Sequence, residues 1–178
     1  MLKIFSTQLS GVFKKIMEKE SFEMEDAGRL LAQAVVGDGS VYIHGFGEMQ
    51  GVVAEGMDGE EPFPKAKRYT DEVVISREDR FLLFSRHSND SKAIKLANRL
   101  QQLDIPFVAV STSVQSEEAT LVELADVHID LRIQRGLIPD ETGNRFGYPT
   151  LIAALFAYYG IKFTLEEIIQ EYEDDSEE

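Results

Sequence analysis

The segment DRFLLFSRHSNDS, residues 79–91, decides the fold of this chain of 178 residues. Its apolar run, Phe81–Phe84, does not alternate with polar residues, which is typical of a parallel strand covered on both faces. A polar turn follows directly. Beyond it, apolar residues recur at helical spacing: Ala93, Leu96, Ala97, Leu100 and Leu103. The segment therefore predicts a strand, a turn and a helix in succession, which is the repeating unit of an α/β sheet.

The same alternation of strands and helices extends in both directions from this segment. Further strands are expected at residues 41–44, 72–76, 105–110 and 127–131, and further helices at residues 117–124, 149–159 and 164–172. Two helices are expected before the first strand, at residues 2–16 and 22–35, with Ser21 as the N-cap of the second. Thr164 and Glu167 have the spacing of a capping box. We predict an α/β fold, a three-layer α-β-α sandwich with a five-stranded parallel sheet, flavodoxin-like winding and two N-terminal helices.

Composition excludes several classes of function. The chain has no cysteine, so it has no disulfide framework, thiolate metal site or cysteine nucleophile. It has 32 acidic and 18 basic residues, a formal net charge of −14, which disfavours nucleic acid and anionic membranes as partners. No apolar run reaches the ~20 residues that span a bilayer, and the start lacks a signal peptide pattern, so we expect a cytoplasmic protein. Its histidines lack metal-ligand spacing, and we expect neither a metal nor a cofactor.

Three polar loops follow predicted strands, where ligands of open parallel sheets bind. The glycines after the first strand would either cradle a phosphate or only form a tight turn. The hydroxyl loop, residues 85–91, would either bind an anion or only cap the next helix. The hydroxyls after the fourth strand would either bind the same ligand as the hydroxyl loop or only end the strand. The candidate binding residues are Gly45, Gly47, Ser85, Ser88, Asn89, Ser91, Ser111 and Thr112.

These three loops, in this order, resemble the sugar isomerase (SIS) domain family, whose members bind phosphosugars. The resemblance runs over residues 32–131 and is best in residues 79–85, in residues 105–112 and at Ala125-Asp126. The chain is most similar to phosphoheptose isomerase-like members, in a small uncharacterised bacterial group. The resemblance implies a single SIS-like domain over residues 1–173, before an acidic tail at 174–178, with a phosphorylated sugar as its ligand. It also implies a homodimer or higher homo-oligomer, in which Arg145 either reaches a neighbour's phosphate or lies in a plain surface loop.

The sequence departs from the family pattern at the residues that the resemblance makes catalytic. Glu48 stands where the family's first loop carries a serine that touches phosphate, and the late helix has no histidine. Aldose–ketose isomerisation needs an acid and a base across one carbon–carbon bond. Glu55 with His87 is the pair we name for this work, and Glu48 with His44 is the alternative pair.

The sequence leaves the function open between classes. The first is a phosphosugar-binding domain, either a binder or sensor or a phosphoheptose-type sugar phosphate isomerase. The second is a SIS scaffold that acts through protein–protein interaction, which the altered first loop favours. A nucleotide-binding enzyme is the third, and it rests on the glycines of residues 45–51 alone.

Overall fold

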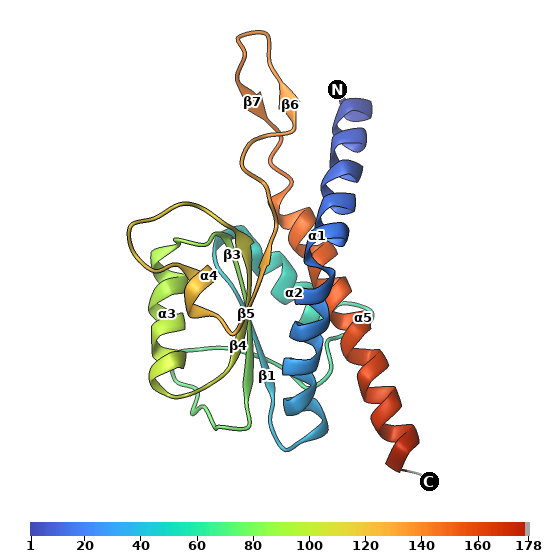
Figure 1. Ribbon diagram of the computed structural model, residues 1–178, viewed down its shortest axis with the longest axis vertical. Helices are drawn as coiled ribbons and strands as arrows, with labels where there is room; N and C mark the ends of the chain where they lie inside the picture. Colours follow the sequence, from blue (N-terminus) through green and yellow to red (C-terminus); the bar gives the residue numbers. More distant parts are fainter. Residues whose placement is uncertain (177–178) are drawn as a thin grey trace.

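A computed structural model, which describes residues 1–176, has five parallel strands in one sheet (Figure 1). The strands stand in the order β2-β1-β3-β4-β5, which confirms the predicted sheet and its winding. Their bounds are β1 (Val41–Gly45), β2 (Ala66–Arg68), β3 (Arg80–His87), β4 (Phe107–Thr112) and β5 (Val127–Asp130). All the central strands therefore end at the same edge, which is called the carboxyl edge below.

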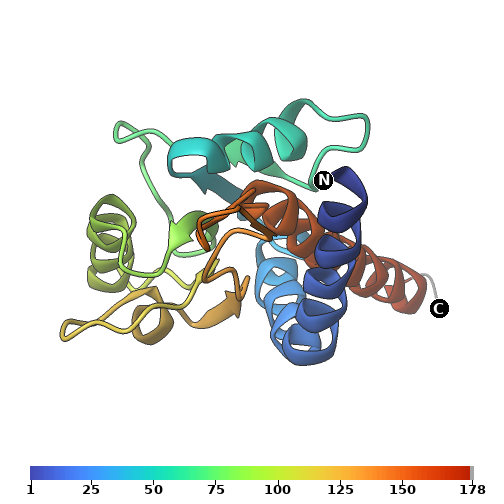
Figure 2. The same cartoon turned by 90° about the horizontal axis from the view of Figure 1, so that it is seen from above.

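Helices cover both faces of the sheet (Figures 1 and 2). One face is covered by α1 (Leu2–Val36), α2 (Gln50–Asp58) and α5 (Thr150–Ser176), and the other by α3 (Ser91–Gln102) and α4 (Leu121–Leu124). Successive residues of β3 belong to two separate cores: Leu82 and Phe84 to the α1 side, Phe81 and Leu83 to the α3 side. Both faces of β3 are therefore buried, which is why its sequence is apolar without alternation.

The first and last helices cross at close range. The rings of Phe13 and Phe156 stack with their centroids 4.5 Å apart. At Gly28 of α1, an added Cβ would lie 2.8 Å from Thr164 Cγ2, and at Gly160 of α5 it would lie 2.5 Å from Met24 Sδ. Because larger side chains would collide there, these two glycines set the separation of the helices.

The prediction of a strand at residues 72–76 was wrong. The edge strand is β2, whose residues Ala66, Lys67 and Arg68 pair with Val41, Tyr42 and Ile43. Its polar sequence gives no apolar signal because an edge strand is half exposed. Residues 72–76 belong instead to the irregular crossover to β3, where the Val74 side chain is 92% exposed.

The predicted breaks in the terminal helices were also wrong. Helix α1 runs through Ser21 without a cap, and α5 runs through Gly160. The Thr164 hydroxyl donates to the Gly160 carbonyl inside the helix at 3.1 Å, so it caps nothing. The chain therefore has one N-terminal helix rather than two. Helix α5 continues to Ser176, into the expected tail, and residues 177–178 lie outside the described residues.

A short hairpin projects beyond the carboxyl edge, beside the start of α1 (Figure 1). Its strands are β6 (Ile138–Pro139) and β7 (Arg145–Phe146), which pair antiparallel. The Arg145 guanidinium donates to the carbonyls of Gly136 and Leu137 at 2.8 and 2.7 Å. Arg145 therefore closes its own hairpin. Across residues 1–176, none of the helices combines the length and apolar character that crossing a membrane requires.

Candidate functional site

The three loops that the sequence singled out meet at the carboxyl edge. The Phe46 amide donates to the Phe84 carbonyl at 2.9 Å, which joins the first loop to β3. The Ser88 amide donates to the Thr112 carbonyl at 2.9 Å, which joins the hydroxyl loop to the end of β4. Because β1, β3 and β4 are neighbours in the sheet, their ends form one continuous surface.

The first loop makes a tight turn between β1 and the 3-10 helix η1 (Gly47–Met49). At Gly45, an added Cβ would lie 2.2 Å from the Met49 carbonyl oxygen, so only glycine fits there. Gly47 has φ +60 and no atom within 4 Å of an added Cβ, so its backbone is open to an approaching ligand. The tight-turn interpretation holds for Gly45, and ligand binding stays a prediction for Gly47.

The hydroxyl loop uses its buried serines for its own structure. A register shift lies between Phe84 and His87, and the Ser85 hydroxyl donates across it to the His87 carbonyl at 2.8 Å. The Ser88 side chain is fully buried and accepts from the Val114 amide at 3.1 Å. Asn89 and Ser91 are exposed.

Asp90 caps the helix that follows the hydroxyl loop. Its carboxylate accepts from the amides of Lys92 and Ala93 at 3.0 and 2.9 Å. The helix cap that the sequence offered as one interpretation of this loop is therefore present in the structure. It uses two of the amides that would otherwise be available to an anion.

Ser111 and Thr112 are the last two residues of β4, so their hydroxyls point to opposite faces of the sheet, and both side chains are fully buried. The Ser111 hydroxyl and His128 Nε2 are 2.8 Å apart. Burial lowers the pKa of His128 from 6.5 to about 4, against the smaller raising effects of Asp130 and Glu123. On the other face, Thr112 Oγ1 accepts from the Ile133 amide at 3.4 Å.

The negative charge of Glu48 is balanced by an ion pair beside the hydroxyl loop. Arg86 Nε donates to Glu48 Oε1 at 2.7 Å, and this hydrogen bond, with the nearby Arg86 and His87, holds the pKa of Glu48 below its usual value. His87 Nδ1 is buried and has no hydrogen-bond partner among the described residues. The structure thus brings Glu48 toward His87, whereas the alternative pairing set it with His44.

Glu55 and His87, the pair named from the sequence, face different surroundings. Glu55 Oε1 accepts from the Tyr159 hydroxyl of α5 at 2.5 Å. Its backbone carbonyl also bonds to Gly59, at the end of α2 that lies away from the carboxyl edge. His87 ends β3, on that edge. No hydrogen bond or ion pair of residues 1–176 joins these two side chains.

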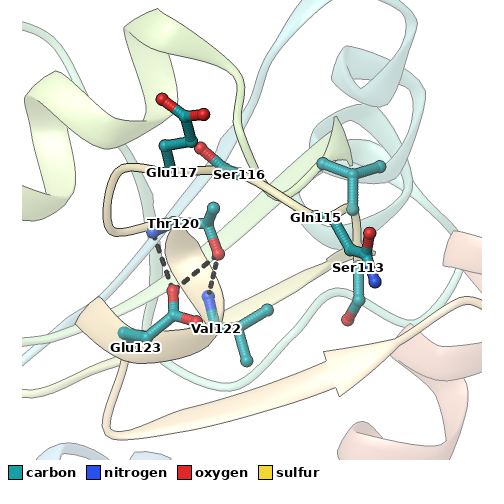
Figure 3. Close-up of a pocket in the computed structure, with 8 residues that line it drawn as sticks. Ser113, Gln115, Ser116, Glu117, Thr120, Val122 and Glu123 are labelled. Carbon is teal, nitrogen blue, oxygen red and sulfur yellow. Dashed lines mark hydrogen bonds between the residues drawn. The ribbon is translucent and has the colours of Figure 1, made fainter.

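Two hollows open on this end of the molecule. The acidic hollow, of 720 Å³, lies over the loop between β4 and α4 and is lined by residues 113–117, 120, 122 and 123 (Figure 3). Figure 3 shows its capping box, in which the Thr120 hydroxyl accepts from the Val122 amide and Glu123 accepts from the amide and hydroxyl of Thr120. This cap starts α4 at Leu121 rather than at the predicted residue 117. With Glu117 and Glu123 in its lining, this hollow disfavours an anion.

The basic hollow, of 870 Å³, lies between the first loop, α3 and the chain after β2. Its floor includes His44, whose ring meets those of Phe46 and Tyr69 edge-on at 4.7 and 5.5 Å. Burial lowers the pKa of His44, against the smaller raising effect of Asp71. The lining is completed by Gly45, Gly47, Gln50, Thr70, Lys92, Lys95, Leu96 and Arg99.

Sequence reasoning missed the cations of this hollow. Lys92, Lys95 and Arg99 recur at steps of three and four residues, so they form one stripe along α3, beside its buried apolar stripe. That spacing was the available signal. Arg99 donates to the Tyr69 hydroxyl at 2.8 Å and lies 3.8 Å from the Asp71 carboxylate. Lys92 and Lys95 form no ion pair with any of the described residues.

The fold of this chain, with its parallel sheet, is similar to that of the sugar isomerase domain of the RpiR transcription factor from Sphaerobacter thermophilus, with a TM-score of 0.57 and 10% identity over 97% of each chain. Within this fold, the chain belongs to the DUF2529 family, described as a domain of unknown function, whose model matches residues 1–169. The uncharacterized protein YwjG of Bacillus subtilis (strain 168) is 42% identical over 173 residues, which are 97% of this chain and 99% of that protein.

Several solved structures are similar over nearly the whole chain. The Vibrio vulnificus NanR protein complexed with ManNAc-6P has a TM-score of 0.66 and 12% identity, covering 99% of this chain and 64% of its own. This chain thus spans less than two thirds of NanR. The Escherichia coli CFT073 protein c3406, solved as a complex, has a TM-score of 0.65 and 13% identity, over 95% and 89%. Protein MJ1247 of Methanococcus jannaschii, for which a 3-hexulose-6-phosphate isomerase function is inferred, has a TM-score of 0.61 and 15% identity. The match covers 97% of this chain and 90% of MJ1247.

Proposed function

We propose that this chain binds a phosphorylated sugar at the carboxyl edge of its sheet, as a binder or sensor. The observation that carries the proposal is the basic hollow, in which three cations face one carboxylate, although the whole chain has a net charge of −14. A cationic concavity on an acidic surface concentrates small anions. Its position, at the end of parallel strands, is where such sheets bind ligands. The complex of NanR with ManNAc-6P and the function inferred for MJ1247 support a sugar phosphate as the ligand class.

The surroundings of the carboxylates favour binding without isomerisation. Glu48, at the edge, is bonded to Arg86, which makes it a weaker base because its pKa is lowered. Glu55 is bonded to Tyr159 on α5. Proton transfer between two sugar carbons requires a base within hydrogen-bond reach of both positions, and neither carboxylate is free to act so.

A panel of sugar phosphates tests the proposal by thermal unfolding. Sedoheptulose 7-phosphate, glucosamine 6-phosphate and fructose 6-phosphate are each compared with the parent sugar and with ADP. A ligand at 100 times its Kd adds about 2.7 kcal/mol to the free energy of unfolding, which raises Tm by about 5 °C or more in a domain of this size. The matching sugar phosphate is expected to do this and to be recovered unchanged by NMR.

Three outcomes contradict all or part of the proposal. An unchanged Tm with every sugar phosphate favours the alternative of a scaffold that acts through protein partners. A shift with ADP alone favours the nucleotide-binding alternative. Conversion of a bound sugar phosphate to its isomer overturns the assignment as a binder while keeping the ligand class.

We further propose that the chain forms a homodimer through the outer face of α1 and α5. Met17 is 55% exposed and Phe163 is 54% exposed, and both line a hollow between the helices whose lining also includes Met24 and Phe156. A self-complementary apolar face suits a two-fold dimer. Light scattering is expected to give twice the 20.0 kDa mass of the chain, and Met17→Glu with Phe163→Glu to give a folded monomer. A monomeric mass for the unaltered chain at micromolar concentration contradicts this.

A further inference from the structure

We propose that the basic hollow, rather than the hydroxyl loop, binds the phosphate group of the ligand. This inference rests on the proposed function, and it assigns the phosphate to Lys92 and Lys95 of α3. It also assigns Asp71 as a counter-charge that opposes binding. None of these three residues belongs to the loops that the sequence indicated.

Four of the candidate hydroxyl groups at the carboxyl edge are already engaged. Ser85, Ser88, Ser111 and Thr112 are all fully buried. Each has a partner inside the fold: the His87 carbonyl, the Val114 amide, His128 Nε2 and the Ile133 amide, in that order. Ser88 and Thr112 only accept in these contacts and keep a hydrogen to donate, but a phosphate would have to reach them through a surface that presents little of any of the four hydroxyls.

The carboxylates near the hydroxyl loop oppose a phosphate as well. Glu48 lies beside Arg86 and His87, and the Arg86 guanidinium is already bound to the Glu48 carboxylate. The Asp90 carboxylate occupies the two amides at the start of α3. A phosphate dianion placed there would meet two like charges within one loop, which is unfavourable.

The basic hollow offers the opposite surroundings. Lys92 and Lys95 line it, are exposed, and have no ion-pair partner among residues 1–176. Gly47 opens the backbone on the facing wall. The edges of His44, Phe46 and Leu96 form a less polar side against which the carbon skeleton of a sugar can rest. Ammonium groups bind phosphate as point charges without a fixed geometry, so the two lysines together suit a dianion.

Asp71 is the one carboxylate in the lining of this hollow, and its position predicts whether its removal strengthens or weakens phosphate binding. It lies 3.8 Å from Arg99 Nη1, and its side chain is 95% exposed. An incoming phosphate is repelled by Asp71 and attracted by Arg99. Removing this carboxylate should therefore strengthen binding, whereas removing the lysines should weaken it.

The test measures binding by calorimetry with three probes: inorganic phosphate, pyrophosphate and glucosamine 6-phosphate. Lys92→Gln with Lys95→Gln is expected to weaken the Kd of the phosphate-bearing probes at least about tenfold, and Asp71→Asn to tighten it about threefold. Raising NaCl from about 20 to 200 mM should weaken binding by the unaltered chain more than by the double variant, because exposed charges are screened. The matched control is Lys15→Gln with Lys19→Gln, which removes the same charge from exposed positions on α1. All four lysines are exposed, so each variant should keep the unaltered Tm.

The outcomes separate this inference from the proposed function. If glucosamine 6-phosphate binds and both double variants bind it equally, the basic hollow is not the phosphate site, although the function stands. If phosphate or pyrophosphate binds in a manner that needs Lys92 and Lys95 and no sugar phosphate of the panel does, the site stands and the sugar assignment falls. If no probe binds up to millimolar concentration, both are overturned.

Discussion

Replacing Glu20 with alanine is expected to lower the free energy of unfolding by about 3 kcal/mol at pH 7, because it breaks a buried ion pair from one side. Glu20 is 3% exposed on α1. Its carboxylate accepts from the Asp130 amide at 3.1 Å and from Arg132 Nε at 2.7 Å. Arg132 itself has φ +57, a left-handed backbone that the surrounding contacts must hold. The substitution leaves the Asp130 amide without its acceptor and Arg132 without its anchor.

The variant Glu20→Gln separates hydrogen bonding from charge. Burial raises the pKa of Glu20 against the lowering effects of the Asp130 amide and of Arg132, so the buried charge carries a cost of its own. Glutamine keeps an acceptor without that cost, and we expect it to lose less than alanine does. Glu18→Ala, at an exposed position of the same helix, should change stability by less than about 0.5 kcal/mol. Urea unfolding measures all three, and a loss below about 1 kcal/mol in Glu20→Ala would show that the contact does not hold the loop after β5.

Acid is expected to destabilise the fold through His128, by about 3 kcal/mol between pH 6.5 and 4. The unfolded chain takes up a proton on this ring near pH 6.5, whereas burial keeps the folded ring neutral until its pKa of about 4. Over that interval the unfolded state binds more protons than the folded state. The free energy of unfolding therefore falls by about 1.4 kcal/mol for each pH unit below 6.5.

The difference between the unaltered chain and His128→Gln isolates this effect. Carboxylates titrate near the lower end of the interval in both proteins, so subtracting the two pH curves removes their contribution. Glutamine does not protonate and can still bond the Ser111 hydroxyl, so the variant should have the flatter curve between pH 6.5 and 5. Chemical unfolding at a series of pH values measures both. Parallel curves would mean that His128 takes up its proton equally well in the folded state.

The buried parts of the fold could be predicted from the sequence, and the exposed parts could not. Residues 81–84 and 107–110 lie in central strands whose two faces are buried, which requires an apolar run that is visible in the sequence. The edge strand, residues 66–68, is stabilised by backbone pairing with β1 on one side only. Its side chains are largely exposed, so they have no apolar pattern that would reveal the strand. The terminal helices continue through Ser21 and Gly160 because tertiary contact overrides the local cap and glycine signals.

The candidate site was predicted in position more than in detail. The alternation of strands and helices predicted a parallel sheet, and the structure brings the three loops together at its carboxyl edge. The use of each hydroxyl depended on partners such as Val114 and His128, which are distant in sequence. The stripe of cations on α3 became meaningful only when the structure placed it opposite the first loop, across the basic hollow.

The crossing of α1 and α5 also constrains when the chain can fold during synthesis. The helix that carries Gly28 emerges from the ribosome more than about 100 residues before the helix that carries Thr164, its neighbour in the finished domain. Until then, the apolar stripe of α1 and one face of the central strands have no complete cover. Contacts of such long sequence separation slow folding and prolong the exposure of hydrophobic surface that can aggregate. The nascent chain therefore depends on its last segment to escape aggregation, and truncation within α5 should be more damaging than its distance from the carboxyl edge suggests.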